Sequence, residues 1–247
     1  MKTLRMLLLA SGLLASLPIA LPAAAQEGDE ALRSWRASAV VTAADVERFG
    51  IDACFSIGEI DDATFARMQG RSYKAECTLP RSDLRYVKVL HVDAEGRIRL
   101  GELVCHRFVA RDLVEIFRRL YDVRYPIERM VLIDDYDADD GASMRADNSS
   151  AFNFRYIQHS RSLSKHSLGT AVDINPLYNP YVRRVGGRTV VDPPEAAPYV
   201  DRTRDFPYKI ERDDPCCREF RRHGFTWGGD WKSLKDYQHF EKALPDR

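Results

Sequence analysis

Apolar positions in residues 84–125 change from the spacing of strands to the spacing of a helix. Two strand-like runs, LRYVKVLHV and IRLGELVCH, flank a polar stretch in which Gly96 suits a turn, so the pattern predicts a β-hairpin. The next run, FVARDLVEIFRRLYDVRYP, predicts a helix that ends before Pro126. Its apolar side chains recur at helical spacing, at Val109, Leu113, Ile116, Phe117 and Leu120. IERMVLIDDY then predicts a buried strand, and the whole block predicts an α+β fold in which helices pack on an antiparallel sheet.

Residues 26–80 form a lead-in and extension before this block. Residues 26 to about 50 are polar and rich in alanine, which predicts a loosely packed segment, although TAADVERFG can begin a helix capped by Thr42. In IGEIDDATFARMQGRSY a short helical pattern ends at Gly70.

After the block, polar stretches alternate with short strand and helix patterns. The acidic run from Asp134 to Asp140 lacks the spacing of a calcium-binding EF-hand and predicts a solvated loop. SSAFNFRYI and TAVDI predict strands, and residues 174–202 predict a long surface loop of the kind that borders a binding cleft. DPCCREFRRHGF predicts a helix with Asp214 as its cap and Pro215 at its first position.

The N-terminal segment MKTLRMLLLASGLLASLPIALPAAAQ has the order of a secretory signal peptide. Two basic residues precede an apolar run, and three alanines that end at Ala25 form a small-residue cleavage site. An uncleaved membrane anchor is the alternative, but two prolines interrupt a run that is already short for a spanning helix. We therefore expect a signal peptide over residues 1–25, an extension over 26–80 and a folded domain over 81–247, in a secreted or periplasmic protein.

The charge balance argues against a protein that binds nucleic acid. The chain has 37 basic and 37 acidic residues, and removal of residues 1–25 takes away two basic side chains and no acidic one, which changes the net charge from 0 to −2. No other apolar run is long enough to span a bilayer, so no membrane contact is expected after signal cleavage. No residue pattern specifies an oligomeric state.

Five cysteines are present, at Cys54, Cys77, Cys105, Cys216 and Cys217. An exported protein meets conditions in which disulfides form, and an odd number leaves at least one thiol unpaired within the chain. A bridge between Cys54 and Cys77 is the preferred pairing because both flank one short segment. The spacings do not fit a zinc ribbon, so structural roles are expected for all five.

Two short stretches, SKHSLGTAVD and DYQHFE, hold the candidate metal ligands. A catalytic zinc site takes three protein ligands and leaves one position for water, and imidazole and carboxylate groups are suitable donors. His166, Asp173 and His239 would supply two nitrogens and one oxygen. Gly169 would let the chain bend between the first histidine and the strand TAVDI. Asp236, three residues before the last histidine, would share a face with it in a helical turn and so reach the water.

The two stretches, extended to SKHSLGTAVDINPLYNPYV and HGFTWGGDWKSLKDYQHFE, resemble the M15 family of zinc peptidases. That family includes D-alanyl-D-alanine carboxypeptidases, D-Ala-D-Ala dipeptidases and L-alanyl-D-glutamate endopeptidases. Its pattern is S-x-H-x-x-G-x-A-x-D, followed later by an acidic residue three before a histidine. WGGDW is similar to the endopeptidase branch, and the resemblance is strongest over residues 141–242. It implies a hedgehog/DD-peptidase-like α+β fold around one core that contains zinc.

The resemblance implies a role for each of the four side chains. His166, Asp173 and His239 match the zinc ligands of the family. Asp236 matches the general base, which takes a proton from the attacking water and later passes it to the leaving amine. Zn2+ is thus the expected cofactor, and the resemblance implies that residues 81–247 form a zinc peptidase domain.

The family also uses an arginine, placed before the histidine motif, to polarise the scissile carbonyl and hold the developing oxyanion. The common GYR form is absent here, so Arg155 in AFNFR is the closest match and Arg145 in SMRAD is the second choice. A purely structural arginine is the alternative. Independently of the family, Glu241 is placed where a carboxylate could orient the imidazole of His239.

Three functions remain open at this point. The first is an exported zinc-dependent peptidase that hydrolyses peptidoglycan stem peptides, as a D-Ala-D-Ala carboxypeptidase or an L-Ala-D-Glu endopeptidase. The alternative is a non-catalytic zinc-containing binding module of the hedgehog type, which the presence of Asp236 disfavours because the general base is retained. A structural secreted protein held by disulfides would leave the spacing of both stretches unexplained.

Overall fold

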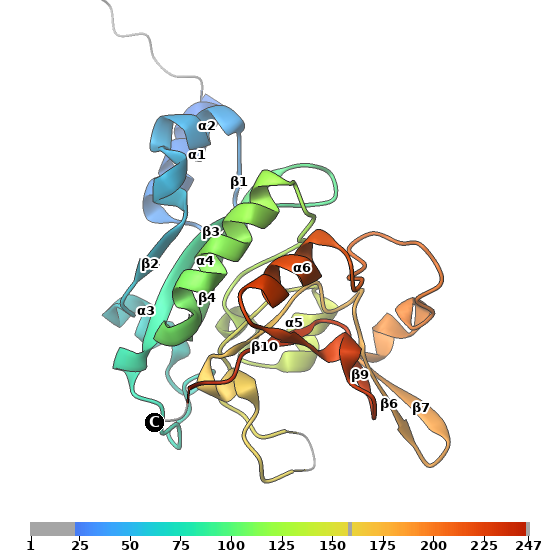
Figure 1. Cartoon of the computed structure of the whole chain (residues 1–247). Coiled ribbons are helices and arrows are strands. Elements are labelled where there is room, and N and C mark those ends of the chain that lie inside the picture. Colours follow the sequence, from blue (N-terminus) through green and yellow to red (C-terminus); the bar gives the residue numbers. More distant parts are fainter. Residues whose placement is uncertain (1–22, 158–159, 246–247) are drawn as a thin grey trace, which may run out of the picture.

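The computed structural model describes residues 23–157 and 160–245, and its centre is an antiparallel sheet with the strand order β1-β4-β3-β2 (Figure 1). The strands are β1 (Val40–Val41), β2 (Ser56–Gly58), β3 (Leu84–Val92) and β4 (Ile98–His106). β3 and β4 pair along their full length, from Leu84 opposite His106 to Val92 opposite Ile98, so the predicted hairpin is confirmed. Gly96 has a φ of +79° in the connecting turn, which glycine adopts without strain.

Helix α4 (Arg107–Asp122) covers one face of this sheet, as its apolar spacing predicts. Five side chains at the predicted positions are at most 1% exposed, and these are Val109, Leu113, Ile116, Phe117 and Leu120. Helix α6 (Pro215–Arg222) lies against α4, with the ring centroids of Phe117 and Phe220 6.1 Å apart. Full burial of one such side chain contributes about 1.5–3 kcal/mol, so this contact firmly joins the C-terminal part of the chain to the central sheet.

The N-terminal extension packs on the same sheet. Its elements are α1 (Ala23–Ser34), α2 (Ala43–Phe49), the 3-10 turn η1 (Ile51–Cys54), α3 (Asp62–Met68) and the 3-10 turn η2 (Arg81–Asp83). Thr42 caps α2 as predicted, in a capping box with Asp45. Trp35 is buried in a cluster with Leu90 of β3, and β1 and β2 add to the two edges of the sheet. The loose packing expected for residues 26–50 is therefore wrong, because apolar side chains spaced along α1 and α2 are buried against the sheet.

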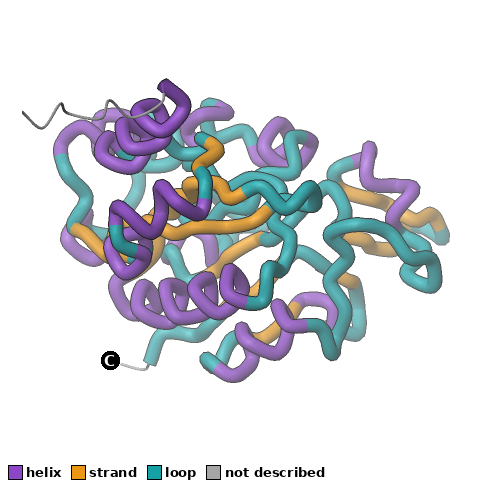
Figure 2. The backbone as a smooth tube through the Cα atoms, turned by 90° about the horizontal axis from the view of Figure 1, so that it is seen from above, coloured by secondary structure: helices purple, strands orange, loops and turns teal. Residues whose placement is uncertain are grey.

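After α4 the chain forms two further three-stranded sheets, in the orders β5-β10-β8 and β7-β6-β9. Their strands are β5 (Ala171–Asp173), β6 (Tyr181–Val185), β7 (Arg188–Asp192), β8 (Thr226–Trp227), β9 (Lys235–Asp236) and β10 (His239–Glu241). The helical segments among them, besides α6, are η3 (Ile133–Tyr136), α5 (Asp140–Arg145), η4 (Lys165–Leu168), η5 (Pro194–Tyr199) and η6 (Gly228–Asp230). Seen from above, helices lie around the strands of the main body (Figure 2). The predicted α+β class with antiparallel sheets is confirmed.

Two predicted strands are instead extended segments without a regular ladder. In IERMVLIDDY the backbone oxygen of Met130 accepts a hydrogen bond from Glu102 N at 3.0 Å. In SSAFNFRYI the Phe152 N donates to Val104 O at 2.9 Å. Each segment bonds to several neighbours in turn and makes only isolated bridges, so both predicted strands are wrong, although the burial predicted for IERMVLIDDY is right.

The acidic run and the long loop are more ordered than the sequence predicts. The run forms η3 and the start of α5, and Asp134 is buried where it accepts hydrogen bonds from the backbone N and Oγ of Ser72, both at 3.0 Å. Within residues 174–202, β6 and β7 form a hairpin that turns at Gly186 and Gly187, both with positive φ. This hairpin extends from the body next to β9 (Figure 1).

The predicted bridge between Cys54 and Cys77 is wrong, because all five thiols are free. Cys54 is buried in the cluster with Leu90, whereas Cys77 packs at the edge of a different cluster, which contains Phe152. Burial raises the pKa of the Cys54 thiol to about 11, which keeps it protonated and inert. Cys54 and Cys77 are near each other in sequence but do not meet in the structure, because they pack in separate apolar clusters.

None of the described helices is both long and apolar enough to cross a membrane. The predicted signal peptide, residues 1–25, lies outside the described residues apart from its last three, which begin α1. It therefore stays a prediction from the sequence.

Candidate metal centre and active site

Strands β5 and β10 place two of the candidate ligands opposite each other. The strands are antiparallel, and Asp173 is the direct partner of His239. Side chains of directly opposed residues lie on the same face of a sheet, so the carboxylate and the imidazole project together. The alternation predicted for TAVDI is observed, since Val172 and Ile174 are fully buried in the main core on the opposite face.

The 3-10 turn η4 brings His166 to the same point. Ser164 caps it, with its Oγ accepting from His166 N at 3.2 Å, and Gly169 ends it with a φ of +65°. A Cβ at Gly169 would lie 2.6 Å from the backbone N of His106, which itself donates to Gly169 O at 2.8 Å. Glycine is therefore required twice here, for the left-handed conformation and for the close approach of η4 to the end of β4.

The three side chains meet in one compact group. The donor atoms of His166, Asp173 and His239 all lie within 4.8 Å of one another. Nε2 of His166 is 3.2 Å from Oδ2 of Asp173, and Nδ1 of His239 is 3.0 Å from Oδ1 of the same carboxylate. The two imidazole nitrogens are 3.2 Å apart. Two nitrogens and one oxygen converge on a single point, which is the donor set and number of a catalytic zinc site.

The outward-facing nitrogen of each histidine is also held. Nδ1 of His166 lies 2.6 Å from Ala151 O, and Nε2 of His239 lies 3.1 Å from Oε2 of Glu241. A neutral imidazole that donates to these oxygens turns its other nitrogen, with a free lone pair, toward the centre. The predicted contact of Glu241 with His239 is confirmed, and the chemistry of the whole set fits a zinc ion.

The electrostatics of the cluster point the same way. Burial alone would lower the pKa of His239, but hydrogen bonds to Asp173 and Glu241 outweigh it and raise that pKa to about 10. Burial alone would raise the pKa of Asp173, yet the charges and hydrogen bonds of His166 and His239 hold it well below its usual range. The site thus stabilises positive charge, which a metal cation can supply in place of a proton.

Asp236 lies beside this group but reaches it from a strand. The helical turn expected for DYQHFE is wrong, because β9 ends at Asp236 and β10 begins at His239. Burial raises the pKa of Asp236 to about 7, against the opposing charge of His239, and its Oδ1 is buried with no hydrogen-bond partner. A Cβ on Gly228 would lie 2.5 Å from Asp236 O. The first glycine of WGGDW therefore lets the backbone of β9 pass directly beside η6. Sequence reasoning did not assign that role to Gly228.

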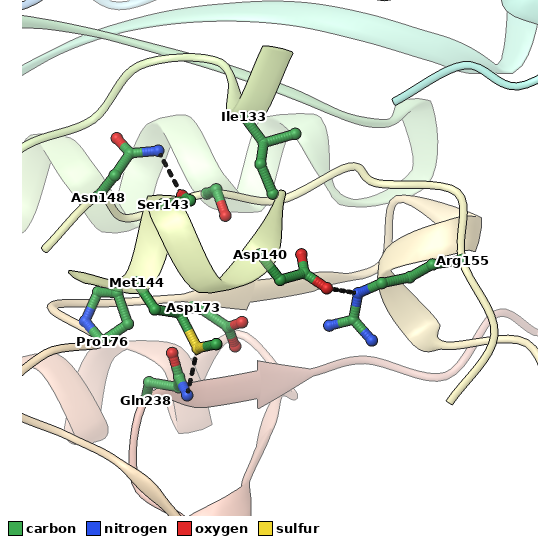
Figure 3. A pocket seen from close by; sticks show the side chains of 10 residues that line it. Ile133, Asp140, Ser143, Met144, Asn148, Arg155, Asp173, Pro176 and Gln238 are labelled. Atoms are coloured by element: carbon green, nitrogen blue, oxygen red, sulfur yellow. Dashed lines mark hydrogen bonds and ion pairs between the residues drawn. The ribbon is translucent and has the colours of Figure 1, made fainter. Parts of the chain in front are cut away.

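Arg155 and Asp173 line the same small pocket, whereas Arg145 of α5 is exposed and does not line it (Figure 3). Arg155 forms an ion pair with Asp140, and its backbone N donates to Ser167 Oγ at 2.8 Å. The structure therefore brings the first-choice arginine to the candidate site, anchored next to η4.

Sequence reasoning missed two further residues of this site. Asp140, which pairs with Arg155, was one of several acids in a run that predicted only a solvated loop. The ring of Trp231 lies 5.4 Å from that of His239, so it packs beside a candidate metal ligand. The tryptophan was noticeable in WGGDW, but nothing in the sequence separated cleft lining from packing.

Comparison with known proteins gives a family match over the C-terminal part of the chain. Residues 158–242 match an M15 peptidase family model described as D-alanyl-D-alanine carboxypeptidase. The matched segment contains the three converging donors and Asp236, whereas Arg155 lies just before it. No curated protein and no solved structure matched the chain.

Proposed function

We propose, on the premise that residues 158–242 match the model of the M15 peptidase family, that the chain is a zinc-dependent hydrolase of peptide bonds in peptidoglycan stem peptides. The observation that carries the proposal is the convergence of two imidazole nitrogens and one carboxylate, with the partly buried carboxyl of Asp236 beside them. The bond cleaved is either the terminal D-Ala–D-Ala bond or the L-Ala–D-Glu bond. The signal peptide predicted over residues 1–25 supports an exported enzyme, because this substrate lies outside the cytoplasm.

In this proposal His166, Asp173 and His239 hold the zinc ion. A zinc ion bound there supplies a Lewis acid for the scissile carbonyl and lowers the pKa of water to about 7. The hydrogen bonds from the two histidines to Ala151 and Glu241 fix the ring orientations, so the donors are in place before the ion binds.

Asp236 acts as the general base. Its free Oδ1 can accept a proton from the attacking water, and its pKa near 7 suits a group that must take up and release that proton at neutral pH. The same carboxyl then protonates the nitrogen of the leaving amine. A hedgehog-type binding module has no need of such a group, which is why a catalytic role is preferred.

Arg155 donates hydrogen bonds to the carbonyl oxygen as negative charge develops on it. The ion pair with Asp140 and the backbone bond to Ser167 limit the motion of this side chain before substrate binds. A preoriented donor of this kind contributes about 100- to 1000-fold to the rate.

The test is digestion of purified peptidoglycan by the zinc-loaded protein, with mass spectrometry of the released fragments. Loss of a single D-Ala identifies a carboxypeptidase, and separation of the stem from the glycan identifies an endopeptidase. Asp236→Ala should lower turnover by at least about 100-fold while zinc content stays close to one ion per chain. Asp205→Ala, at an exposed position, serves as the matched control.

Two results would overturn the proposal. One is cleavage that survives complete removal of zinc by a chelator. The other is full activity in the Asp236 variant, which would remove the assigned base.

A further inference from the structure

The sheet β7-β6-β9 presents a set of polar side chains next to the general base. Tyr181 of β6 is paired with Asp236 of β9 on one side and with Asp192 of β7 on the other. Directly opposed residues project from the same face, so the tyrosine stands between the two carboxyl groups. Burial raises the pKa of Tyr181, and the charges of both carboxylates add to this rise.

Arg183 belongs to the same face, because it is two residues along β6 from Tyr181. The two side chains are close enough for the positive charge of Arg183 to oppose the rise in the pKa of Tyr181. Arg183 therefore lies on the side of the site that Asp236 occupies, whereas Arg155 contacts Ser167 of η4 and Asp140 of α5.

Arg183 is partly buried, yet it has no partner in the described parts of the chain. Its Nε is buried without a hydrogen-bond acceptor. Among residues 23–157 and 160–245 no carboxylate lies within ion-pair distance of its guanidinium, and Asp192 and Asp236 on the same face are also beyond it. Withdrawing the Nε donor of a guanidinium from water without a partner costs free energy, so such a group is retained where something outside the chain completes it.

We propose that Arg183 binds the free carboxylate of the substrate residue on the leaving-group side of the scissile bond, with Tyr181 between that residue and the general base. The inference rests on the proposed function. Asp236 must face the nitrogen of the leaving amine in order to protonate it, so the group beside Asp236 faces the residue that carries this nitrogen. A guanidinium fork matches a carboxylate in charge and geometry.

The substrate class follows from this placement. A terminal D-Ala and a D-Glu both carry a carboxylate in the leaving group, so the arginine suits either of the two candidate bonds. It selects against a substrate in which that carboxylate is blocked as an amide, because a guanidinium without a partner in the described chain would then face an uncharged group. The hairpin of β6 and β7 lies beside β9 (Figure 1). This hairpin therefore carries the residue that selects between the two substrates.

The experiment compares two peptides that differ only at the carboxylate next to the cleaved bond, which is a free acid in one and an amide in the other. The wild-type, zinc-loaded protein should prefer the acid by about 10- to 100-fold in kcat/KM. Arg183→Gln should lose this preference by slowing cleavage of the acid while leaving the amide unchanged. Arg184→Gln, on the opposite face of the same strand and exposed, should behave as wild type.

A binding measurement separates recognition from turnover. In the Asp236→Ala background, calorimetry should show that the acid binds more tightly than the amide, and that Arg183→Gln removes the difference. Equal cleavage of acid and amide by the wild type, or a preference that survives Arg183→Gln, overturns the inference and leaves the peptidase intact. If the wild type cleaves neither peptide nor peptidoglycan, the proposed function itself fails, and the inference fails with it.

Discussion

Glu241 offers a direct test of how the chain prepares its metal site. Its Oε2 lies 3.1 Å from Nε2 of His239, and the two side chains are 26% and 8% exposed. A carboxylate in this position fixes the ring so that Nδ1 faces Asp173, and it makes the imidazole a better donor. Loss of such a partner weakens metal binding by about 10- to 100-fold, which corresponds to about 1.4–2.7 kcal/mol.

The expected loss of zinc affinity depends on the residue that replaces Glu241. Glu241→Gln keeps an oxygen that can accept from Nε2 but removes the charge, and solvent already screens about a quarter of this side chain. We therefore expect zinc affinity to fall about 10-fold in Glu241→Gln, and by more in Glu241→Ala, which leaves the ring nitrogen without its partner.

The assay is a competition titration of zinc against a chromophoric chelator at neutral pH. Glu211→Gln is the control, because Glu211 pairs with Lys209 on the surface and does not touch the histidines. The unfolding temperature of each metal-free variant shows whether the fold is intact. An unchanged zinc dissociation constant in a folded Glu241→Ala protein would refute the idea that this carboxylate orients His239.

Two further predictions concern stability. Gly169→Ala combines a φ of +65° with a Cβ 2.6 Å from His106 N, so it should cost at least about 2 kcal/mol in urea unfolding and weaken zinc binding through His166. Gly186→Ala has a similar φ in open space and should cost only about 1–2 kcal/mol; equal losses would contradict the steric argument. Burial raises the pKa of Asp147 to about 7, and its Oδ2 has no partner, so ionisation destabilises the fold increasingly as the pH rises from about 4 through 7. Asp147→Asn should therefore be about 2–4 kcal/mol more stable than wild type at pH 8 and about equal to it at pH 4, and a difference independent of pH would show that the carboxyl is not the cause.

Local patterns in the sequence were sufficient to predict the elements whose buried positions recur at a regular spacing. The hairpin of β3 and β4 and the helix α4 follow from periods of two and 3.6, because each element buries one continuous face. The caps Thr42 and Asp214 were also readable, since a side chain that accepts from a backbone N a few residues later needs no distant partner.

Extended segments that bond to several neighbours were not readable in this way. The segments around Met130 and Phe152 are apolar and buried, but their hydrogen-bond partners lie far away in sequence. The free cysteines belong to the same class of error, since Cys54 and Cys77 are near each other in the chain and packed in separate clusters.

The candidate ligands His166, Asp173 and His239 were predicted from the sequence, because their side-chain chemistry suits a metal ion and the two stretches that contain them resemble the M15 zinc peptidases. What surrounds them was decided by the tertiary structure. The pairing of β5 with β10 sets the Asp173 carboxylate opposite the last histidine, and the backbone oxygen of Ala151 and the carboxylate of Glu241 fix the rings. Such contacts join residues that folding alone brings together, and a linear pattern carries no record of them.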